Sequence, residues 1–380
     1  MNAWVTKCPG SIVPGSRIAA TKGLLLAVCL CFADPVYAQY ATFEGTVVDS
    51  ASGMPLQDAH VFIASSLLGT SSDAHGRFAL SRVPPGSHRL MITMLGYAPA
   101  IRDTLIRADQ RYEFSFSLPS KAVPLEEVVV NARQARRWQR RLLKFERLFL
   151  GETTNSSETT IVNPHVLSFK SRLGNLSASA SAPLIIENRA LGYHIRYYLK
   201  EFEHFGSTIK YDGDPSYTEL EPADSAQAAF WEAGRRQAFL GSQRHFLLAL
   251  IAQRTADEGF EVLRRSSFDR SAGRFRVDPG TLLEPGPTPL EHLLTFHGIL
   301  EIVYTGEFET EAFRRWQRMA EWARPGPQRS FMELNHGPTL VDQNGEVIDP
   351  YGVVVYGYYA FERIADQAPK EYRPPEWAPR

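Results

Sequence analysis

Two carboxylates and two tyrosines form a dense group of side chains that could bind a ligand. They are Tyr211, Asp212, Asp214 and Tyr217, and the Gly, Pro and Ser residues between them favour a loop. Carboxylate oxygens on a loop could coordinate Ca²⁺, and together with tyrosine rings they could bind a sugar. Asp, Gly, Pro and Ser also build ordinary turns, so turn formation is the competing interpretation.

The common catalytic motifs are absent from the sequence. No histidine has a glutamate three positions later, and no His-Glu-x-x-His, Gly-x-Ser-x-Gly, Gly-x-x-x-x-Gly-Lys-Ser/Thr or Gly-x-Gly-x-x-Gly segment occurs. His297 and Glu301 are four residues apart, a spacing that matches no familiar zinc motif. We therefore predict no catalytic, cofactor-binding or metal-binding residue, although missing motifs do not exclude a site assembled from distant residues.

Length and composition suit a globular protein with two domains. The chain has 380 residues, of which 44% are hydrophobic and 22% are charged. One hydrophobic core rarely grows past about 250–300 residues, so a second core is expected. A net charge of −1 provides no overall field that would attract nucleic acid or an anionic membrane.

The first 38 residues are predicted to be a secretory signal peptide. Basic residues precede an apolar run from Leu24 to Phe32, and Ala38 ends an A-x-A-like cleavage site. The run is too short for a membrane span, which needs about twenty residues. We expect an exported chain in the periplasm or at the outer membrane, without a transmembrane span once the signal is cleaved. Cleavage would also remove all three cysteines, Cys8, Cys29 and Cys31.

Residues 41–119 contain about seven short segments in which apolar and polar side chains alternate, with turn residues between them. Residues 59–63 show the alternation, and the prolines of residues 83–86 interrupt it because they cannot donate to a central strand. This pattern predicts an all-β sandwich. Asp49 and Asp73 are expected to bond their own turn backbones rather than a calcium ion.

A specific order of glycines, turn residues and alternating apolar residues runs through this segment. It consists of Gly45, Val47, Asp49, Gly53, Pro55, Leu56, Ala59, Val61, Ile63, Gly69, Thr70, Asp73, Gly76, Phe78, Leu80, Val83, Pro84, Pro85, Gly86, Leu90, Ile92, Gly96 and Tyr97. The series resembles the carboxypeptidase regulatory-like domain of envelope proteins from Bacteroidetes-type bacteria. The resemblance implies a transthyretin-like sandwich with a structural or docking role, often placed ahead of an outer-membrane transporter.

Residues 120–132 are predicted to be a linker or an edge strand. The stretch Leu125–Asn131 is similar to the segment that opens the plug of TonB-dependent transporters. The rest of the chain is too short for a large transporter barrel, so the transporter itself is not expected.

Residues 133–150 are predicted to form a basic amphipathic helix. Trp138, Leu142, Phe145 and Phe149 recur at spacings of three and four, while arginines and a lysine take the other faces. Such a helix could contact anionic lipid or nucleic acid. A solvated face above a core stripe is the competing interpretation.

Residues 133–366 mix short strand patterns, among them residues 353–361, with a helical stretch at 223–254, which predicts an α+β domain. Phe230 is expected in the core beneath the helical stretch, which Gly234 and Gly241 could interrupt. Asn344-Gly345 indicates a hairpin of type I′, and residues 367–380 are predicted to be a Pro-rich tail. Several stretches look like uncharacterised envelope proteins, a resemblance that implies no activity; they are residues 149–153, 163–169, 183–188 and 241–247.

We therefore expect a non-enzymatic binding or scaffold protein of the envelope, with an envelope protein or a glycan as its partner. An enzyme of undescribed type acting on envelope glycan or peptide is one alternative. An accessory protein of a TonB-dependent transporter is another. No nucleic acid partner and no cofactor are expected.

Overall fold

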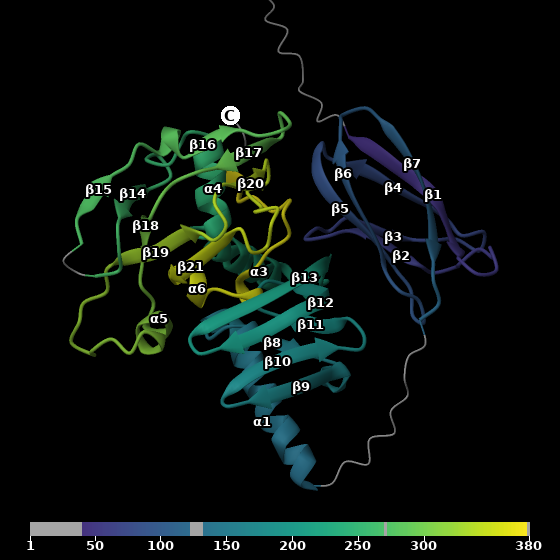
Figure 1. Cartoon of the computed structure of the whole chain (residues 1–380), viewed down its shortest axis with the longest axis horizontal. Coiled ribbons are helices and arrows are strands. Elements are labelled where there is room, and N and C mark those ends of the chain that lie inside the picture. Colours follow the sequence, from purple (N-terminus) through teal and green to yellow (C-terminus); the bar gives the residue numbers. More distant parts are fainter. Residues whose placement is uncertain (1–39, 122–131, 270–271, 378–380) are drawn as a thin grey trace, which may run out of the picture. The chain divides into compact units, whose positions relative to one another are not determined.

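The computed structural model describes residues 40–121, 132–269 and 272–377, within the chain drawn in Figure 1. The predicted signal peptide and most of the predicted linker at 120–132 lie outside the described residues. Residues Gln39–Arg380 cluster as one compact unit. Within the described residues, no helix is both long enough and apolar enough to cross a membrane.

Seven strands form the predicted sandwich, in a three-stranded sheet of order β4-β1-β7 and a four-stranded sheet of order β3-β2-β5-β6. Phe43, Val61 and Leu90 are fully buried between them, as the alternation predicts. The strands are β1 (Ala41–Asp49), β2 (His60–Ile63), β3 (Gly69–Ser71), β4 (Arg77–Val83), β5 (Gly86–Thr93), β6 (Ala100–Ile106) and β7 (Arg111–Leu118).

Strand β1 is central to its sheet, antiparallel to β4 and parallel to β7. Gly45 permits this close pairing, because a Cβ atom there would lie 2.1 Å from the carbonyl oxygen of Phe114. The turn role predicted for two aspartates is also confirmed. Asp49 Oδ1 accepts the backbone N–H of Ser52 at 2.7 Å, and Asp73 Oδ1 accepts that of Arg77 at 2.9 Å. These bonds to the charged form lower the pKa of both carboxyls.

A six-stranded sheet follows, with order β8-β11-β12-β10-β9 and with β13 paired to β12 (Figure 1). The predicted basic helix lies against it as α1 (Ala132–Phe149). Leu142, Phe145 and Phe149 are buried, as predicted, and the Trp138 indole N–H donates to the Leu167 carbonyl at 3.0 Å. The other elements are α2 (Thr154–Ser157), β8 (Thr159–Ile161), η1 (Pro164–Val166), β9 (Leu167–Arg172), β10 (Asn175–Ala180), β11 (Leu184–Asn188), β12 (Tyr193–Phe205) and β13 (Thr208–Glu219).

The predicted helical stretch at 223–254 forms two helices, α3 (Ser225–Phe239) and α4 (Gln243–Ile251). Gly241 separates them with a φ of 72°, as expected for a glycine that ends a helix. Gly234 does not interrupt α3; it allows a close approach to the Ala190 carbonyl. Phe230 was expected in the core but is exposed, because it lies outside the buried stripe of α3.

A five-stranded sheet of order β15-β14-β18-β19-β21 and a three-stranded sheet of order β16-β17-β20 complete the β-rich second domain. Helix α4 packs into their shared core. The elements are β14 (Phe260–Arg265), β15 (Arg274–Arg276), η2 (Pro279–Thr281), β16 (Leu283–Pro285), β17 (Glu291–Leu294), β18 (Ile299–Phe308), α5 (Glu311–Trp316), β19 (Pro327–Leu334), β20 (Thr339–Asp342), β21 (Val353–Gly357), α6 (Tyr358–Phe361), η3 (Ile364–Asp366) and η4 (Pro375–Trp377).

Two local predictions need correction. Residues Tyr358–Phe361 form a short helix rather than the end of a strand. The Asn344-Gly345 turn reverses the chain as predicted, but only Gly345 has a positive φ, whereas type I′ requires positive φ at both central residues. The Asp342 carboxylate builds the turn instead, accepting the backbone N–H groups of Asn344 and Glu346 at 2.8 and 2.9 Å.

The predicted Pro-rich tail packs against α4 as far as it is described. The Arg244 guanidinium donates to the carbonyls of Ala368, Pro369 and Tyr372, at 3.2, 2.7 and 2.7 Å. Trp377 is buried in the core of the second domain. Arg244 and the buried Trp377 therefore both hold this segment against the second domain.

Candidate functional site

The four residues predicted to bind a ligand lie on strand β13, not on a loop. Side chains of a strand alternate between its two faces, so the tyrosines and the aspartates point in opposite directions. Tyr211 packs edge-on against Phe149 of α1, and Tyr217 packs against Tyr193. Both tyrosines belong to the core beneath α1.

The aspartates on the opposite face already have cationic partners. Lys200 Nζ lies 3.6 Å from Asp212 Oδ2 and 2.8 Å from Asp214 Oδ2. Arg89, on β5 of the sandwich, lies 3.5 Å from Asp214 Oδ1. The four side chains therefore do not converge on one place, and a ligand role for them stays a prediction from the sequence.

A different group of side chains converges on the outer face of the five-stranded sheet, the face turned away from α4. Strand pairing sets it: Glu301 of β18 is opposite Phe331 of β19 and Leu263 of β14. Phe331 in turn is opposite Tyr356 of β21. Arg265 and Arg329 lie two residues from these pairs along their strands and share the same face.

Three arginines surround the fully buried carboxylate of Glu301. Arg265 Nη1 lies 3.6 Å and Arg274 Nε lies 3.2 Å from Glu301 Oε2, while Arg329 donates to Oε1. We call this group the arginine cluster. Three positive charges share one negative charge, so the cluster carries a net charge of +2.

Repulsion within the arginine cluster is visible at Arg329. Burial lowers the pKa of the Arg329 guanidinium, and the neighbouring Arg274 and Arg265 lower it further, while Glu261 acts in the opposite direction. The Nε atom of Arg265 is buried without a hydrogen-bond partner. Guanidinium groups present paired donors that fit carboxylates, so an anion of that shape would relieve the repulsion.

Aromatic rings border the arginine cluster. Phe268 packs edge-on against both Phe331 and Tyr356, with ring centroids 5.6 and 4.8 Å apart. The Tyr356 hydroxyl donates to Glu333 at 2.8 Å, which fixes the ring on the sheet. This group presents half-exposed apolar rings beside fixed positive charge.

A hollow of about 540 Å³ opens next to the cluster, between α5 with the loop that follows it and strand β19. Its walls include Arg329 and Phe331, which also belong to the sheet face, and Phe313 and Arg318 from the α5 side. Trp322 lines it and is 87% exposed. The ring therefore offers a large apolar contact surface beside the arginine cluster.

The loop that carries Trp322 is held by Arg314. Its Nη2 atom donates to the backbone carbonyls of Ala320 and Glu321, both at 3.4 Å, and to that of Ala323. These hydrogen bonds hold the backbone on both sides of Trp322 in a defined conformation.

Metal and histidine chemistry have no comparable basis in the part of the chain that the structure describes. There, no group of three or more His, Cys, Asp or Glu residues could hold a metal ion. His245 is buried and bridges the Gly241 N–H and the Glu258 carboxylate. Burial lowers the pKa of His245 to about 4, so it is neutral and supports the start of α4.

Comparison with known proteins identifies the sandwich. Residues 43–130 match the family model described as the CarboxypepD_reg-like domain. The TonB-dependent transporter Oar of Myxococcus xanthus is 29% identical over 94 residues, which is 24% of this chain and 9% of that protein.

The similar solved structures also share little sequence identity with this chain. The 5-hydroxyisourate hydrolase of Klebsiella pneumoniae is 17% identical, with 22% of this chain and 92% of that chain covered and a TM-score of 0.19. A putative carbohydrate binding protein from Bacteroides uniformis is 10% identical, with 48% and 75% covered and a TM-score of 0.18. Such likenesses carry no activity to this chain. Its sandwich, predicted from the order of its turn residues, is a carboxypeptidase regulatory-like domain.

Proposed function

We propose that this chain is an exported, non-enzymatic binding protein of the cell envelope that recognises an acidic glycan on the outer face of its five-stranded sheet. The observation that carries the proposal is the arginine cluster beside the hollow lined by Trp322. The predicted signal peptide supports export. The carboxypeptidase regulatory-like domain and its likeness to an Oar segment support an envelope location.

The chemistry of the surface favours a sugar acid over a neutral ligand. Guanidinium groups recognise a carboxylate by charge and by paired hydrogen bonds. The apolar face of a sugar ring can pack on Trp322, Phe331 or Tyr356, because aromatic rings offer large rigid apolar surfaces. A hollow of about 540 Å³ lies within the size range of small-ligand pockets and would admit one unit of a longer chain.

Titration of the unit Gln39–Arg380 with polyuronate tests the proposal, with uncharged dextran as the control ligand. Arg329→Gln and Trp322→Ala should each weaken polyuronate binding at least about tenfold, because each removes a central contact. Arg264→Gln and Phe230→Ala are matched controls. Arg264 is exposed on the opposite face of β14, and Phe230 is exposed on α3, so both should leave binding unchanged.

Absence of polyuronate binding would refute this function, as would equal binding of dextran. Equal losses of polyuronate affinity in the test and control variants would show that the ligand does not bind at the arginine cluster. Unchanged thermal unfolding of Trp322→Ala should accompany its loss of binding, since the ring is exposed.

An accessory role for a TonB-dependent transporter is a second candidate, favoured by the match between the sandwich and Oar. In that role the sandwich would be the docking module. Affinity capture with Gln39–Arg380 from outer-membrane extract should then recover such a transporter. If none co-purifies under conditions that retain known envelope complexes, this candidate loses its support.

A further inference from the structure

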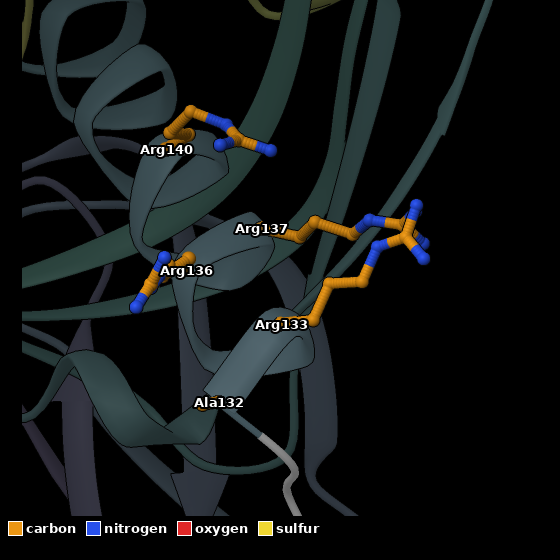
Figure 2. A pocket seen from close by; sticks show the side chains of 5 residues that line it. All are labelled: Ala132, Arg133, Arg136, Arg137 and Arg140. Atoms are coloured by element: carbon orange, nitrogen blue, oxygen red, sulfur yellow. The ribbon is translucent and has the colours of Figure 1, made fainter.

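The exposed side of α1 carries a basic face that the proposed glycan site does not use. With about 100° per residue, Arg133, Arg137, Arg140 and Lys144 form one stripe opposite the buried residues of the helix. Arg136 and Arg147 flank this stripe. Figure 2 shows Arg133, Arg137 and Arg140 extending to one side of the helix and Arg136 to another. We call these six side chains the basic face.

Nothing in the described part of the chain neutralises the first three turns of this face. The sequence from Ala132 to Phe145 contains no acidic residue. No described carboxylate forms an ion pair with Arg133, Arg137 or Arg140, whereas Arg147, near the other end of the helix, lies 3.8 Å from Glu152. Arginines at a helix N-terminus oppose the helix dipole, and like charges four residues apart repel each other. The basic face therefore weakens the isolated helix, and an external anion would offset that cost.

Exposed apolar side chains lie next to the basic face. Leu143 is exposed on α1 itself. Leu173, 91% exposed, occupies the β9–β10 turn, and Lys144 Nζ donates to the carbonyl of the adjacent Gly174 at 2.6 Å. The turn and the helix are thus joined at this point.

Phe205 extends this apolar group. It is 72% exposed at the end of β12. Pairing of Leu176 with His204 places the end of β12 beside the start of β10, at the same end of the sheet as the turn that holds Leu173. Two large apolar side chains, Leu173 and Phe205, therefore project at the same end of the sheet. The neighbouring helix α1 carries only positive charge along its first three turns.

This combination fits a membrane surface better than a soluble polyanion. Lipid phosphates can pair with the arginines, while leucine and phenylalanine side chains enter the boundary between headgroups and acyl chains. A soluble polyanion would use the charge but would leave Leu173 and Phe205 in water. We propose that the basic face, together with Leu143, Leu173 and Phe205, docks the chain reversibly on an anionic lipid surface.

Vesicle flotation of the unit Gln39–Arg380 tests this proposal. The unit should bind vesicles that contain about 30% phosphatidylglycerol, should not bind pure phosphatidylcholine, and should detach in about 0.5 M NaCl. The triple variant Arg133→Gln, Arg137→Gln, Arg140→Gln should bind at least about tenfold more weakly, because each basic residue near the surface adds to the attraction.

A second triple variant separates position from net charge. Arg82→Gln, Arg102→Gln and Arg107→Gln removes the same charge from exposed sites on the sandwich and should bind like the unchanged unit. Equal losses in both triple variants would overturn the proposal, as would equal binding to both vesicle types.

The apolar contribution has its own test. Leu173→Asn suits the positive φ of 49° at that turn, so the turn is preserved. Combined with Phe205→Asn, it should weaken vesicle binding severalfold at constant charge. Unchanged binding would overturn the role of these two side chains. Release from vesicles by inorganic phosphate at constant ionic strength would identify a free-phosphate site. If the unit captured duplex DNA without vesicles, and the first triple variant did not, the ligand would be nucleic acid. Either result would refute lipid docking.

Discussion

Neutralising Glu301 should destabilise the chain far more than neutralising any one of its exposed arginine partners. In Glu301→Gln, the arginine cluster keeps three positive charges around a buried amide. Arg274 and Arg329 have side chains that are 50% and 35% exposed, so they can turn toward water. Arg265 is only 5% exposed and cannot. Loss of one member of a buried ion pair costs about 3–5 kcal/mol, and we expect about 2–4 kcal/mol here because two of the three arginines can escape.

Urea unfolding at neutral pH measures this cost, with Arg274→Gln as the matched exposed variant. Arg274→Gln should cost less than about 1 kcal/mol, as surface pairs do. The double variant Glu301→Gln, Arg265→Met should recover part of the loss, because no unpaired buried charge remains. A multivalent anion such as sulfate should stabilise Glu301→Gln more than the unchanged chain.

Two outcomes would refute this account of the arginine cluster. One is a cost below about 1 kcal/mol for Glu301→Gln, which would mean that the buried carboxylate does not hold the cluster. The other is additivity of Glu301→Gln and Arg265→Met, since contacting charges should show a coupling energy of at least about 0.5 kcal/mol.

Four further substitutions test other parts of the fold. Burial raises the pKa of Asp366 to about 6, so the protonated carboxyl contributes stability at low pH, and this contribution is lost as the pH rises through about 6. The free energy of unfolding should therefore fall between pH 4 and pH 7. Asp366→Asn should make that fall smaller by about 1–2 kcal/mol, a value discounted for the partial exposure of the side chain. Gly192→Ala should cost about 2–4 kcal/mol in urea unfolding, because its φ is 71° and a Cβ atom would lie 2.4 Å from the Trp231 ring. Gly206→Ala has a similar φ of 60° but open space, and should cost only about 1 kcal/mol. Arg244→Lys should expose the C-terminal segment to limited proteolysis, because one ammonium group cannot reach three carbonyls; unchanged cleavage would refute the clamp.

The sandwich could be predicted from the sequence because its signals are local. Each strand alternates within a few residues, and a turn residue such as Gly76 or Asp73 marks each boundary. The basic helix was equally clear, since Phe145 and Phe149 repeat at helical spacing over several turns. These features need no knowledge of distant partners.

The arginine cluster could not be predicted in this way. Arg265, Arg274 and Arg329 come from three strands, and only strand pairing brings them to Glu301. Nothing near any of them in sequence marks it as one of a group. The sequence of β19 gives no alternating pattern that would assign Arg329 to an exposed face, because Gln328, Arg329 and Ser330 form a polar run.

Strand β13 was mistaken for a loop because of Gly213 and Pro215, and the structure explains both. β13 pairs along its length with β12, and its other edge makes an isolated bridge between Ser216 and Ser66, so it is an edge strand, where a proline without an N–H is tolerated. A Cβ atom at Gly213 would lie 2.3 Å from the Tyr197 ring, so glycine is required for packing. Gly213 and Pro215 are therefore compatible with a strand at this position, although both residue types commonly interrupt strands.

The parallel pairing of β1 with β7 also bears on how the sandwich is made. Thr42 pairs with Arg111 and Asp49 with Leu118, so β1 can complete its sheet only after β7 has been synthesised. Contacts between such distant residues slow folding. Until Leu118 has emerged from the ribosome or the export channel, one edge of β1 stays open to pairing with other chains. A nascent chain halted between β6 and β7 should therefore depend on chaperones, whereas one extended past β7 should not.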